Sequence, residues 1–455
     1  PMRNFVWDLN GRYNSKLAFL TRAVNWLPLV STSTESSIDV EGEIAQVLPN
    51  PNTLSNEDTG DPNGVGFIDD FEGSKRVTAP PIMRRYWAQA STPFNKADNE
   101  RGYAFWFNPY GGVATTSIWP DKEVSTTAQN TITEILVMSV NPHWSIAVSD
   151  GISPKQSAWG GITYYFPQSY YDQSNTKYVD IWIKGNSGTL HIDLGKISED
   201  QIPNNKLDSE DRPESGLTMG NGLLDDNEDT GIDGQVDEDE AIVTQKYGTL
   251  GYGADHLTEY GRDPGDPHSD NWKYSEGSSD YSHINGTEGN SKDANGLYPD
   301  TEDLNNNYAI DTDNDYFTAA FDLADASNEY ISGQTYISNK ATGWKLYRIP
   351  LTEFRKDATG ADVAWESVRA CRLWFDGLAG KDSVYIAKIE LVGNEWEELG
   401  VAPDDTASFV TKEASFSLSV INSEDTPDIY DAPKGVQGEY DQVTQTRAKE
   451  QSLVL

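Results

Sequence analysis

Two stretches near the start of the chain alternate apolar and polar residues in the manner of β-strands. In the first, Phe5, Trp7 and Leu9 occupy every second position, and the pattern continues to Tyr13. In the second, residues 38–48, apolar side chains share one face and acidic side chains the other. Transmembrane β-strands are about 9 to 11 residues of such alternation, but ordinary half-buried strands carry the same pattern. Residues 1–49 are therefore predicted to form strands, and the pattern leaves open whether these cross a membrane.

Shorter alternating strands in the middle of the chain predict a β-sandwich. Residues 50–66, rich in Pro, Asn, Asp and Gly, form a predicted linker, and the strands begin after it. They recur in residues 67–195 and again in residues 316–398, with turn residues between them. The clearest strands are predicted at 134–140, 178–184, 189–194, 316–323, 344–349, 371–375 and 385–391. We interpret the two parts as one sandwich, interrupted by an insertion at residues 196–315.

The last segment, residues 399–455, is closer in pattern to the first segment than to the middle. Phe416, Leu418 and Val420 alternate with serines, and the chain stops at Leu455 within another apolar alternation. Neither a signal peptide nor a long apolar helix is present. We expect this segment to rejoin the β-structure of residues 1–49, and the whole sequence to be part of a longer protein.

The insertion carries most of the negative charge of the chain. Residues 200–315 contain 29 acidic and 6 basic residues, and the formal net charge of all 455 residues is −39. The acidic residues stand among Asn and Gly in short turns, which can direct several oxygen ligands at one hard divalent cation. Without a cation they would repel one another strongly. Bound calcium would order an insertion of this length, which has no core of its own. The alternative is a solvated acidic loop with loose counter-ions.

The predicted calcium ligands fall into three groups. The best pattern is residues 303–314, which match positions 1, 3, 5 and 9 of an EF-hand loop but have Tyr308 where Gly is expected and Asn314 where Glu is expected. This mismatch favours a looser oxygen-ligated site over a true EF-hand. The predicted ligands are Asp303, Asn305, Asn307, Asp311, Asp313 and Asp315; Asp225, Asp229, Asp233, Asp237 and Asp239; and, near the start of the sandwich, Asp70 and Glu72.

The sequence gives little support for catalysis or for nucleic-acid binding. The five histidines form no close metal-ligand pair, and the single cysteine, Cys371, alternates with apolar residues as a core thiol would. Asp70 and Glu72 could serve in glycoside hydrolysis, but nothing places a second carboxylate across a cleft. The negative charge disfavours phosphate backbones. Aromatic residues could stack on sugars, although sandwich packing explains them as well: Tyr164, Tyr165, Tyr170, Tyr171 and Trp182.

Five motifs stand out along the chain, at residues 19–28 (FLTRAVNWLP), 40–46 (VEGEIAQ), 67–73 (FIDDFEG), 221–234 (NGLLDDNEDTGIDG) and 444–453 (TQTRAKEQSL). Together they resemble those of a known family, the gliding-motility protein SprA (Sov) family. They span nearly the whole chain in the family's order. No single motif decides the resemblance, but the set is specific.

The resemblance implies a role that composition alone does not indicate. The family forms the outer-membrane translocon of the type IX secretion system, so the end segments would be strands of a large outer-membrane β-barrel. The middle would be a galactose-binding-like jelly roll at the bacterial cell surface, with calcium in its acidic insertion. Implied partners are other segments of the same barrel, secretion-system subunits, secreted proteins in transit and the outer membrane, with no nucleic acid. The family assigns no catalytic residues, so we expect no enzyme.

One alternative of a different class remains open. A secreted, calcium-dependent carbohydrate-binding jelly-roll module would share the sandwich, the acidic insertion and the aromatic residues. A polysaccharide-active enzyme ranks below both hypotheses. Soluble, closed ends would favour the carbohydrate-binding module, whereas strands left to pair with other segments would favour the translocon.

Overall fold

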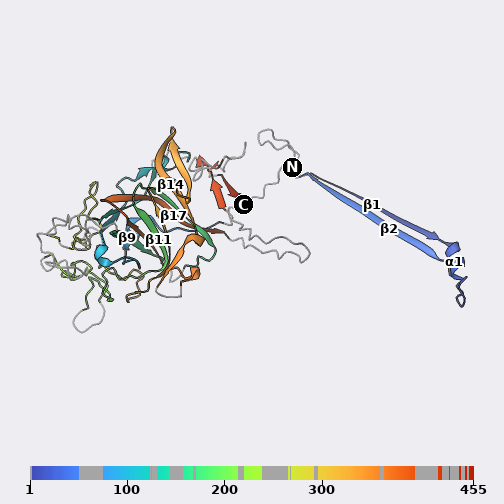
Figure 1. Cartoon of the computed structure of the whole chain (residues 1–455), viewed down its shortest axis with the longest axis horizontal. Coiled ribbons are helices and arrows are strands. Elements are labelled where there is room, and N and C mark those ends of the chain that lie inside the picture. Colours follow the sequence, from blue (N-terminus) through green and yellow to red (C-terminus); the bar gives the residue numbers. More distant parts are fainter. Residues whose placement is uncertain are drawn as a thin grey trace. The chain divides into compact units, whose positions relative to one another are not determined.

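The structure is a computed structural model, shown in Figure 1. It describes residues 3–50, 75–122, 124, 131–142, 157–167, 171–213, 220–237, 265–266, 268–291, 296–358, 363–394, 419–422, 430, 440–441, 446–447 and 450–454. The chain divides into two units, residues 1–70 with 432–437 and residues 71–431 with 438–455. Each unit is considered by itself. None of the described helices is long and apolar enough to cross a membrane.

The first unit contains one long β-hairpin. Strands β1 (Arg3–Lys16) and β2 (Ser37–Asn50) pair antiparallel along their whole length, and α1 (Ala18–Val24) lies between them in sequence. The register places Phe5 opposite Leu48 and Leu9 opposite Ile44, so the apolar residues of both strands share one face. These side chains remain exposed, with Leu9 at 64% and Ile44 at 60%. The alternation at residues 5–13 and 38–48 thus does form paired strands.

The second unit is built on two antiparallel sheets, which agrees with the predicted β-sandwich. The larger sheet has the order β13-β14-β10-β17-β8-β5, with β3 pairing on β17, and the smaller has the order β15-β12-β11-β16-β9-β4. Their bounds are β3 (Lys75–Thr78), β4 (Ala88–Gln89), β5 (Tyr103–Phe107), β8 (Leu136–Asn141), β9 (Trp159–Tyr165), β10 (Thr176–Lys184), β11 (Thr189–Lys196), β12 (Asp315–Asp322), β13 (Ile331–Ile337), β14 (Lys340–Pro350), β15 (Arg355–Ala358), β16 (Ala370–Asp376) and β17 (Asp382–Asn394). The chain is all-β in class, as expected.

Shorter elements complete this unit. Strands β6 (Val113–Ala114) and β7 (Ile132–Thr133) pair beside the short helix α2 (Thr115–Ile118). Near the end of the chain, β18 (Ser419–Asn422) pairs with β21 (Gln451–Val454), and β19 (Tyr440–Asp441) pairs with β20 (Thr446–Arg447). The single-turn 3-10 helices are η3 (Arg84–Tyr86), η4 (Asp98–Glu100), η8 (Leu351–Glu353) and η9 (Trp365–Ser367).

The core lies between the two sheets and draws on both parts of the sandwich. Alternate residues of β10 and β11, such as Ile181 and Ile192, are fully buried together with Leu373 and Ile389 from the second part. Burying each such side chain contributes about 1.5–3 kcal/mol. Cys371 lies in this core, as its alternation predicted.

The other face of the larger sheet is covered by a second, smaller apolar cluster. Trp182 packs edge-on against Trp119, which follows α2, and is 2% exposed. Tyr165 is also buried, and its hydroxyl donates to the carbonyl of Ile197. Of the aromatic residues considered for sugar stacking, these two therefore serve packing, and Tyr170 lies outside the described residues.

A buried ion pair crosses the smaller sheet. Nε of Arg372 on β16 donates to Oδ2 of Asp193 on β11 over 2.8 Å, and both side chains are fully buried. Trp374 also donates to Oδ2 of Asp193, over 2.9 Å. A charge at this depth is stabilised by its partner and its hydrogen bonds rather than by water.

The acidic insertion leaves and returns at one place in the smaller sheet. Strands β11 and β12 pair with each other, and Lys196 stands opposite Asp315 at the point where the insertion begins and ends. In its described parts the insertion contains turns and isolated β-bridges instead of longer strands. Its order must therefore come from hydrogen bonds and charge interactions more than from an apolar core.

Candidate metal-binding loops

The loop at residues 303–311 is closed by hydrogen bonds among the residues that its EF-hand-like spacing singled out. The carboxylate of Asp303 accepts the backbone N–H groups of Asn307 (2.9 Å) and Tyr308 (2.7 Å). The side-chain amides of Asn305 and Asn307 donate to Oδ2 of Asp311 over 2.7 and 3.2 Å. Tyr308 takes the place of the expected Gly with φ of +63°. The four predicted positions 1, 3, 5 and 9 are thus brought together.

A second loop, residues 200–208, repeats this arrangement. The carboxylate of Asp200 accepts the N–H groups of Asn204 (3.2 Å) and Asn205 (2.9 Å), and Asn205 has φ of +58°. The amide of Asn204 donates to Oδ2 of Asp208 over 2.6 Å. Asp200, Asn204 and Asp208 therefore make the same contacts as Asp303, Asn307 and Asp311, and both sets are spaced four residues apart.

A third loop has the same contacts across a longer sequence. The carboxylate of Asp211 accepts the N–H groups of Asn221 (2.9 Å) and Gly222 (2.8 Å). The amide of Asn221 donates to Oδ2 of Asp225 over 3.1 Å. Additional residues between Asp211 and Asn221 lengthen this loop without changing the hydrogen bonds that close it. Asp225, a predicted ligand, thus has the contacts that Asp208 and Asp311 have in the other two loops.

Two of these loops hold each other through buried glutamates. Glu302, which precedes the loop at 303–311, accepts the N–H groups of Ile202 (2.8 Å) and Asp208 (3.1 Å) from the other loop. Glu199, which precedes the loop at 200–208, accepts the N–H groups of Asn305 (3.1 Å) and Asp311 (3.2 Å) in return. Both glutamates are fully buried. The two loops therefore form a reciprocal pair.

Two further glutamates extend the same scheme to the rest of the insertion. Glu228 accepts the N–H groups of Arg212 (3.2 Å) and Asp225 (3.0 Å), which belong to the third loop. Glu210 is fully buried and accepts the N–H groups of Gly231 (3.1 Å) and Asp300 (2.7 Å). Backbone N–H groups without a partner would be costly inside a protein, so these carboxylates hold the loops in place.

Burial makes these glutamates difficult to ionise. Burial raises the pKa of Glu199 to about 7, with a smaller contribution in the same direction from the neighbouring carboxylates of Asp311 and Asp303. Burial likewise raises the pKa of Glu210 and of Glu302 to about 8 in each case. The accepted N–H groups act in the opposite direction. A buried glutamate in the insertion is therefore protonated more readily than an exposed one.

The other predicted ligands do not gather around one point. Asp229 accepts the N–H of Gly289 (2.8 Å), Asp233 pairs with Nδ1 of His268 (2.6 Å), and Asp237 accepts Nδ2 of Asn271 (2.9 Å). Asp313 is exposed and Asp315 begins β12. Asp70, Glu72 and Asp239 lie outside the described residues. Within the described ranges, no three His, Cys, Asp or Glu side chains form a group that could hold a metal ion.

The two shortest loops lack a group of three acidic side chains because an asparagine stands among their ligands. In the loops at 200–208 and 303–311, the fifth position is Asn, so each loop offers two carboxylates together with amide oxygens. Carboxylate and amide oxygens are the ligands that calcium accepts. The donor set of these loops therefore fits a hard cation, and it fits zinc or copper poorly.

The glutamates are the residues that sequence reasoning missed. Their signal is a repeated Glu-Asp pair at 199–200, 210–211, 228–229 and 302–303. In two of these repeats, Asn follows the Asp by four residues and a second Asp follows by eight.

Comparison with known proteins gives a family for the chain. Residues 258–455 match SprA_N, described as a motility related/secretion protein. The match covers 198 of the 455 residues and supports assignment of the chain to the SprA family. This confirms the resemblance found in the motifs, and it makes the chain part of a motility-related or secretion protein. No curated protein matches the sequence.

Solved structures with partial similarity are carbohydrate-binding modules. One is a family 11 carbohydrate-binding module from Clostridium thermocellum, in complex with a β-1,3-1,4-mixed-linked tetrasaccharide; it is 8% identical, with a TM-score of 0.25, covering 70% of this chain and 96% of that one. Another is the family 11 module of the C. thermocellum cellulase Lic26A-Cel5E; it is 10% identical, with a TM-score of 0.24, covering 74% and 98%. We draw no functional conclusion from similarity at this level.

Proposed function

We propose that this chain is a segment of an outer-membrane translocon of the type IX secretion system. In this proposal the β1–β2 hairpin forms two strands of the barrel wall, and the sandwich with its insertion is a domain at the cell surface. Its partners are other segments of the same barrel, secretion-system subunits and secreted proteins in transit. The role is structural and pore-forming, without an enzyme reaction.

The two faces of the hairpin carry this proposal. The apolar residues of β1 run from Phe5 to Tyr13, eight residue steps, which is about 27 Å at about 3.4 Å per residue. The outward apolar band of an outer-membrane barrel is about 25 Å tall. The opposite face carries polar pairs such as Asn10 with Glu43 and Arg12 with Glu41. A barrel strand needs this division between a lipid face and a lumen face.

The exposure of the apolar face supports the same conclusion. A two-stranded hairpin is at best marginally stable alone in water, and strands normally need further pairing or a packed face. Phe5, Leu9 and Ile44 are more than half exposed despite their regular pairing. Lipid on the apolar face and neighbouring strands at both edges would satisfy both needs.

Matched charge substitutions in the full-length protein test the proposal. Leu9→Arg places a charge at the middle of the apolar face, where an arginine facing lipid destabilises a barrel by about 2 to 4 kcal/mol. Asn10→Arg places the same charge one residue later, on the polar face. We expect Leu9→Arg to reduce the amount of heat-modifiable protein assembled in the outer membrane, and Asn10→Arg to leave it unchanged. Equal assembly of the two variants would refute the proposal.

We also propose that calcium stabilises the insertion. The support is the shared geometry of the loops at 200–208 and 303–311 and their oxygen-only donors. Asp303 and Asp311, with Asn305 and Asn307, would hold the ion in one loop. The ion would supply positive charge where carboxylates otherwise repel one another. Its role would be to keep a long surface segment ordered without disulfides.

A further inference from the structure

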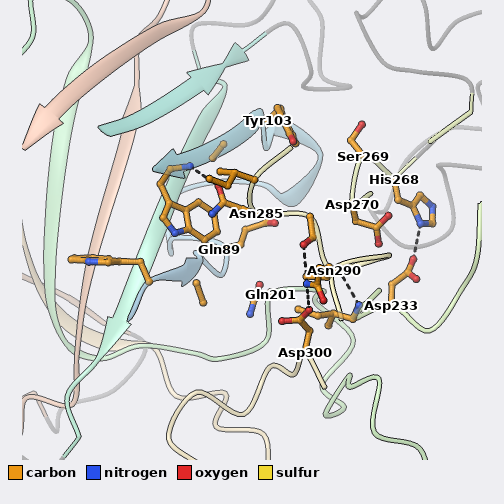
Figure 2. Close-up of a pocket in the computed structure, with 18 of the residues that line it drawn as sticks. Gln89, Tyr103, Gln201, Asp233, His268, Ser269, Asp270, Asn285, Asn290 and Asp300 are labelled. Carbon is orange, nitrogen blue, oxygen red and sulfur yellow. Dashed lines mark hydrogen bonds and ion pairs between the residues drawn. The ribbon is translucent and has the colours of Figure 1, made fainter. Parts of the chain in front are cut away.

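A cavity lies where the sandwich meets the acidic insertion, as Figure 2 shows. Its volume is about 310 Å³. Residues 84–89 and 102–106 of the sandwich form part of its wall, and the insertion supplies the rest, including Gln201, Asp270, Asn290 and Asp300. Cavities that bind small molecules begin at about this size.

One side chain in the wall presents an acceptor that the protein leaves unused. Nδ2 of Asn290 donates to the carbonyl of Gly286 (3.0 Å) and to Oδ2 of Asp300. These two acceptors fix the orientation of the amide, because a flipped amide would set oxygen against oxygen. Asn290 is 3% exposed, and its Oδ1 has no hydrogen-bond partner among the described residues.

A second side chain presents an unused donor. Gln201 is 6% exposed, and its Nε2 has no partner within the part of the chain that the structure describes. An unsatisfied buried polar atom costs about 1–3 kcal/mol, so proteins rarely keep two in one cavity wall without a use. The wall therefore offers a ligand a buried amide donor and a buried amide acceptor, in addition to the carboxylates that line it.

The cavity also has rigid aromatic walls. Nε1 of Trp87 donates to the carbonyl of Pro81 (2.7 Å), and Nε1 of Trp106 donates to the carbonyl of Arg84 (3.0 Å). The hydroxyl of Tyr103 donates to the carbonyl of Ser282. With their polar atoms already bonded, these rings contribute apolar surface to the cavity.

The amide groups, aromatic rings and carboxylates of the cavity wall together disfavour most classes of ligand. The wall holds three carboxylates, those of Asp233, Asp270 and Asp300, against the two guanidinium groups of Arg84 and Arg85, and the net charge of the chain is −39, so an anion is disfavoured. The amide N–H of Gln201 disfavours a bare cation. A purely apolar molecule would leave the buried amides without partners.

We propose that this cavity binds one ring of a neutral sugar. Hydroxyl groups both donate and accept, so one can donate to Oδ1 of Asn290 while another accepts from Nε2 of Gln201. The C–H groups of the sugar ring can contact the small part of Trp87 and Trp106 that lines the cavity, since these side chains are 4% and 6% exposed. The proposal adds a glycan-binding role to the surface domain and does not depend on the translocon role.

The test is ligand binding by the full chain to neutral methyl glycosides of glucose, galactose, mannose and xylose. Saturation-transfer NMR and titration of tryptophan fluorescence report binding near Trp87 and Trp106. We expect at least one glycoside to bind. Gln201→Leu should weaken that binding at least about tenfold, which is about 1.4 kcal/mol. The melting temperature of this variant should not fall, because Nε2 of Gln201 has no hydrogen bond to lose among the described residues.

A control variant distinguishes a loss of sugar binding from a loss of folding. Gln334→Leu removes a half-buried glutamine on β13 that does not line the cavity, and it should leave the affinity unchanged. Methyl glucuronide, the anionic counterpart, should bind more weakly than the glucoside. Failure of all four glycosides to bind, or equal affinity in Gln201→Leu and the unaltered protein, would overturn the proposal.

Discussion

Removing the carboxylate of Glu302 should release the reciprocal pair of loops. Glu302 is fully buried, and it accepts the N–H groups of Ile202 and Asp208. Glu302→Ala leaves both N–H groups without an acceptor, whereas Glu302→Gln keeps one acceptor oxygen and sets an amide N–H against the other N–H.

The contacts set the size of the effect. Each N–H that loses its partner costs about 1–3 kcal/mol, so Glu302→Ala should lower the free energy of unfolding by about 2 to 6 kcal/mol. Glu302→Gln loses one acceptor and should cost about half as much. These costs do not require Glu302 to be ionised, because burial raises its pKa to about 8 and a neutral carboxyl oxygen also accepts hydrogen bonds.

Urea unfolding followed by circular dichroism would measure these differences. Glu276→Ala is the matched control, because Glu276 lies in the same insertion and is exposed. Surface substitutions of this kind usually change stability by no more than about 0.5 kcal/mol. If Glu302→Ala destabilised the chain no more than Glu276→Ala, the reciprocal pair of loops would not be what holds the insertion together.

Three further predictions concern the second unit. Adding a chelator should lower the melting temperature of the chain, and added calcium should restore it. Magnesium should not restore it, because it demands a smaller octahedral site. A melting temperature that the chelator leaves unchanged would rule out structural calcium. Burial raises the pKa of the Cys371 thiol well above its usual value, so a thiol reagent at pH 8 should react only after unfolding, and labelling of the native chain would contradict the buried position. Arg372→Met leaves the buried carboxylate of Asp193 without its ion pair and should lower the free energy of unfolding by about 3–5 kcal/mol. The double variant Arg372→Met with Asp193→Leu should recover most of this loss. A double variant as unstable as the single one would refute this reasoning.

Period-2 alternation was sufficient to predict most of the sandwich. The runs containing Ile181 and Ile192 form β10 and β11, because each strand has one face in the common core and the alternation records that burial directly. The order of strands within the sheets could not be read from the same pattern. It depends on pairing between distant segments, such as β10 with β17, and single-strand periodicity does not identify partners.

The candidate site was predicted in part for a similar reason. The spacing of Asp303, Asn307 and Asp311 is local, so the sequence was enough to predict that they meet. Glu199 and Glu302 act on a loop that lies about a hundred residues away, and no local motif records that contact. Asp233 and Asp237 have the same local spacing, yet His268 and Asn271 engage them instead.

Lipid contact along β1 tests the proposed membrane position of the hairpin most directly. Nitroxide labels would be placed singly at positions 5 to 13 of the full-length protein in lipid bilayers, and their accessibility to oxygen and to a water-soluble nickel complex measured. The account predicts a period of two, with oxygen favoured at Phe5, Trp7 and Leu9 and the nickel complex favoured at Asp8 and Asn10. High accessibility to the nickel complex at all positions would contradict it.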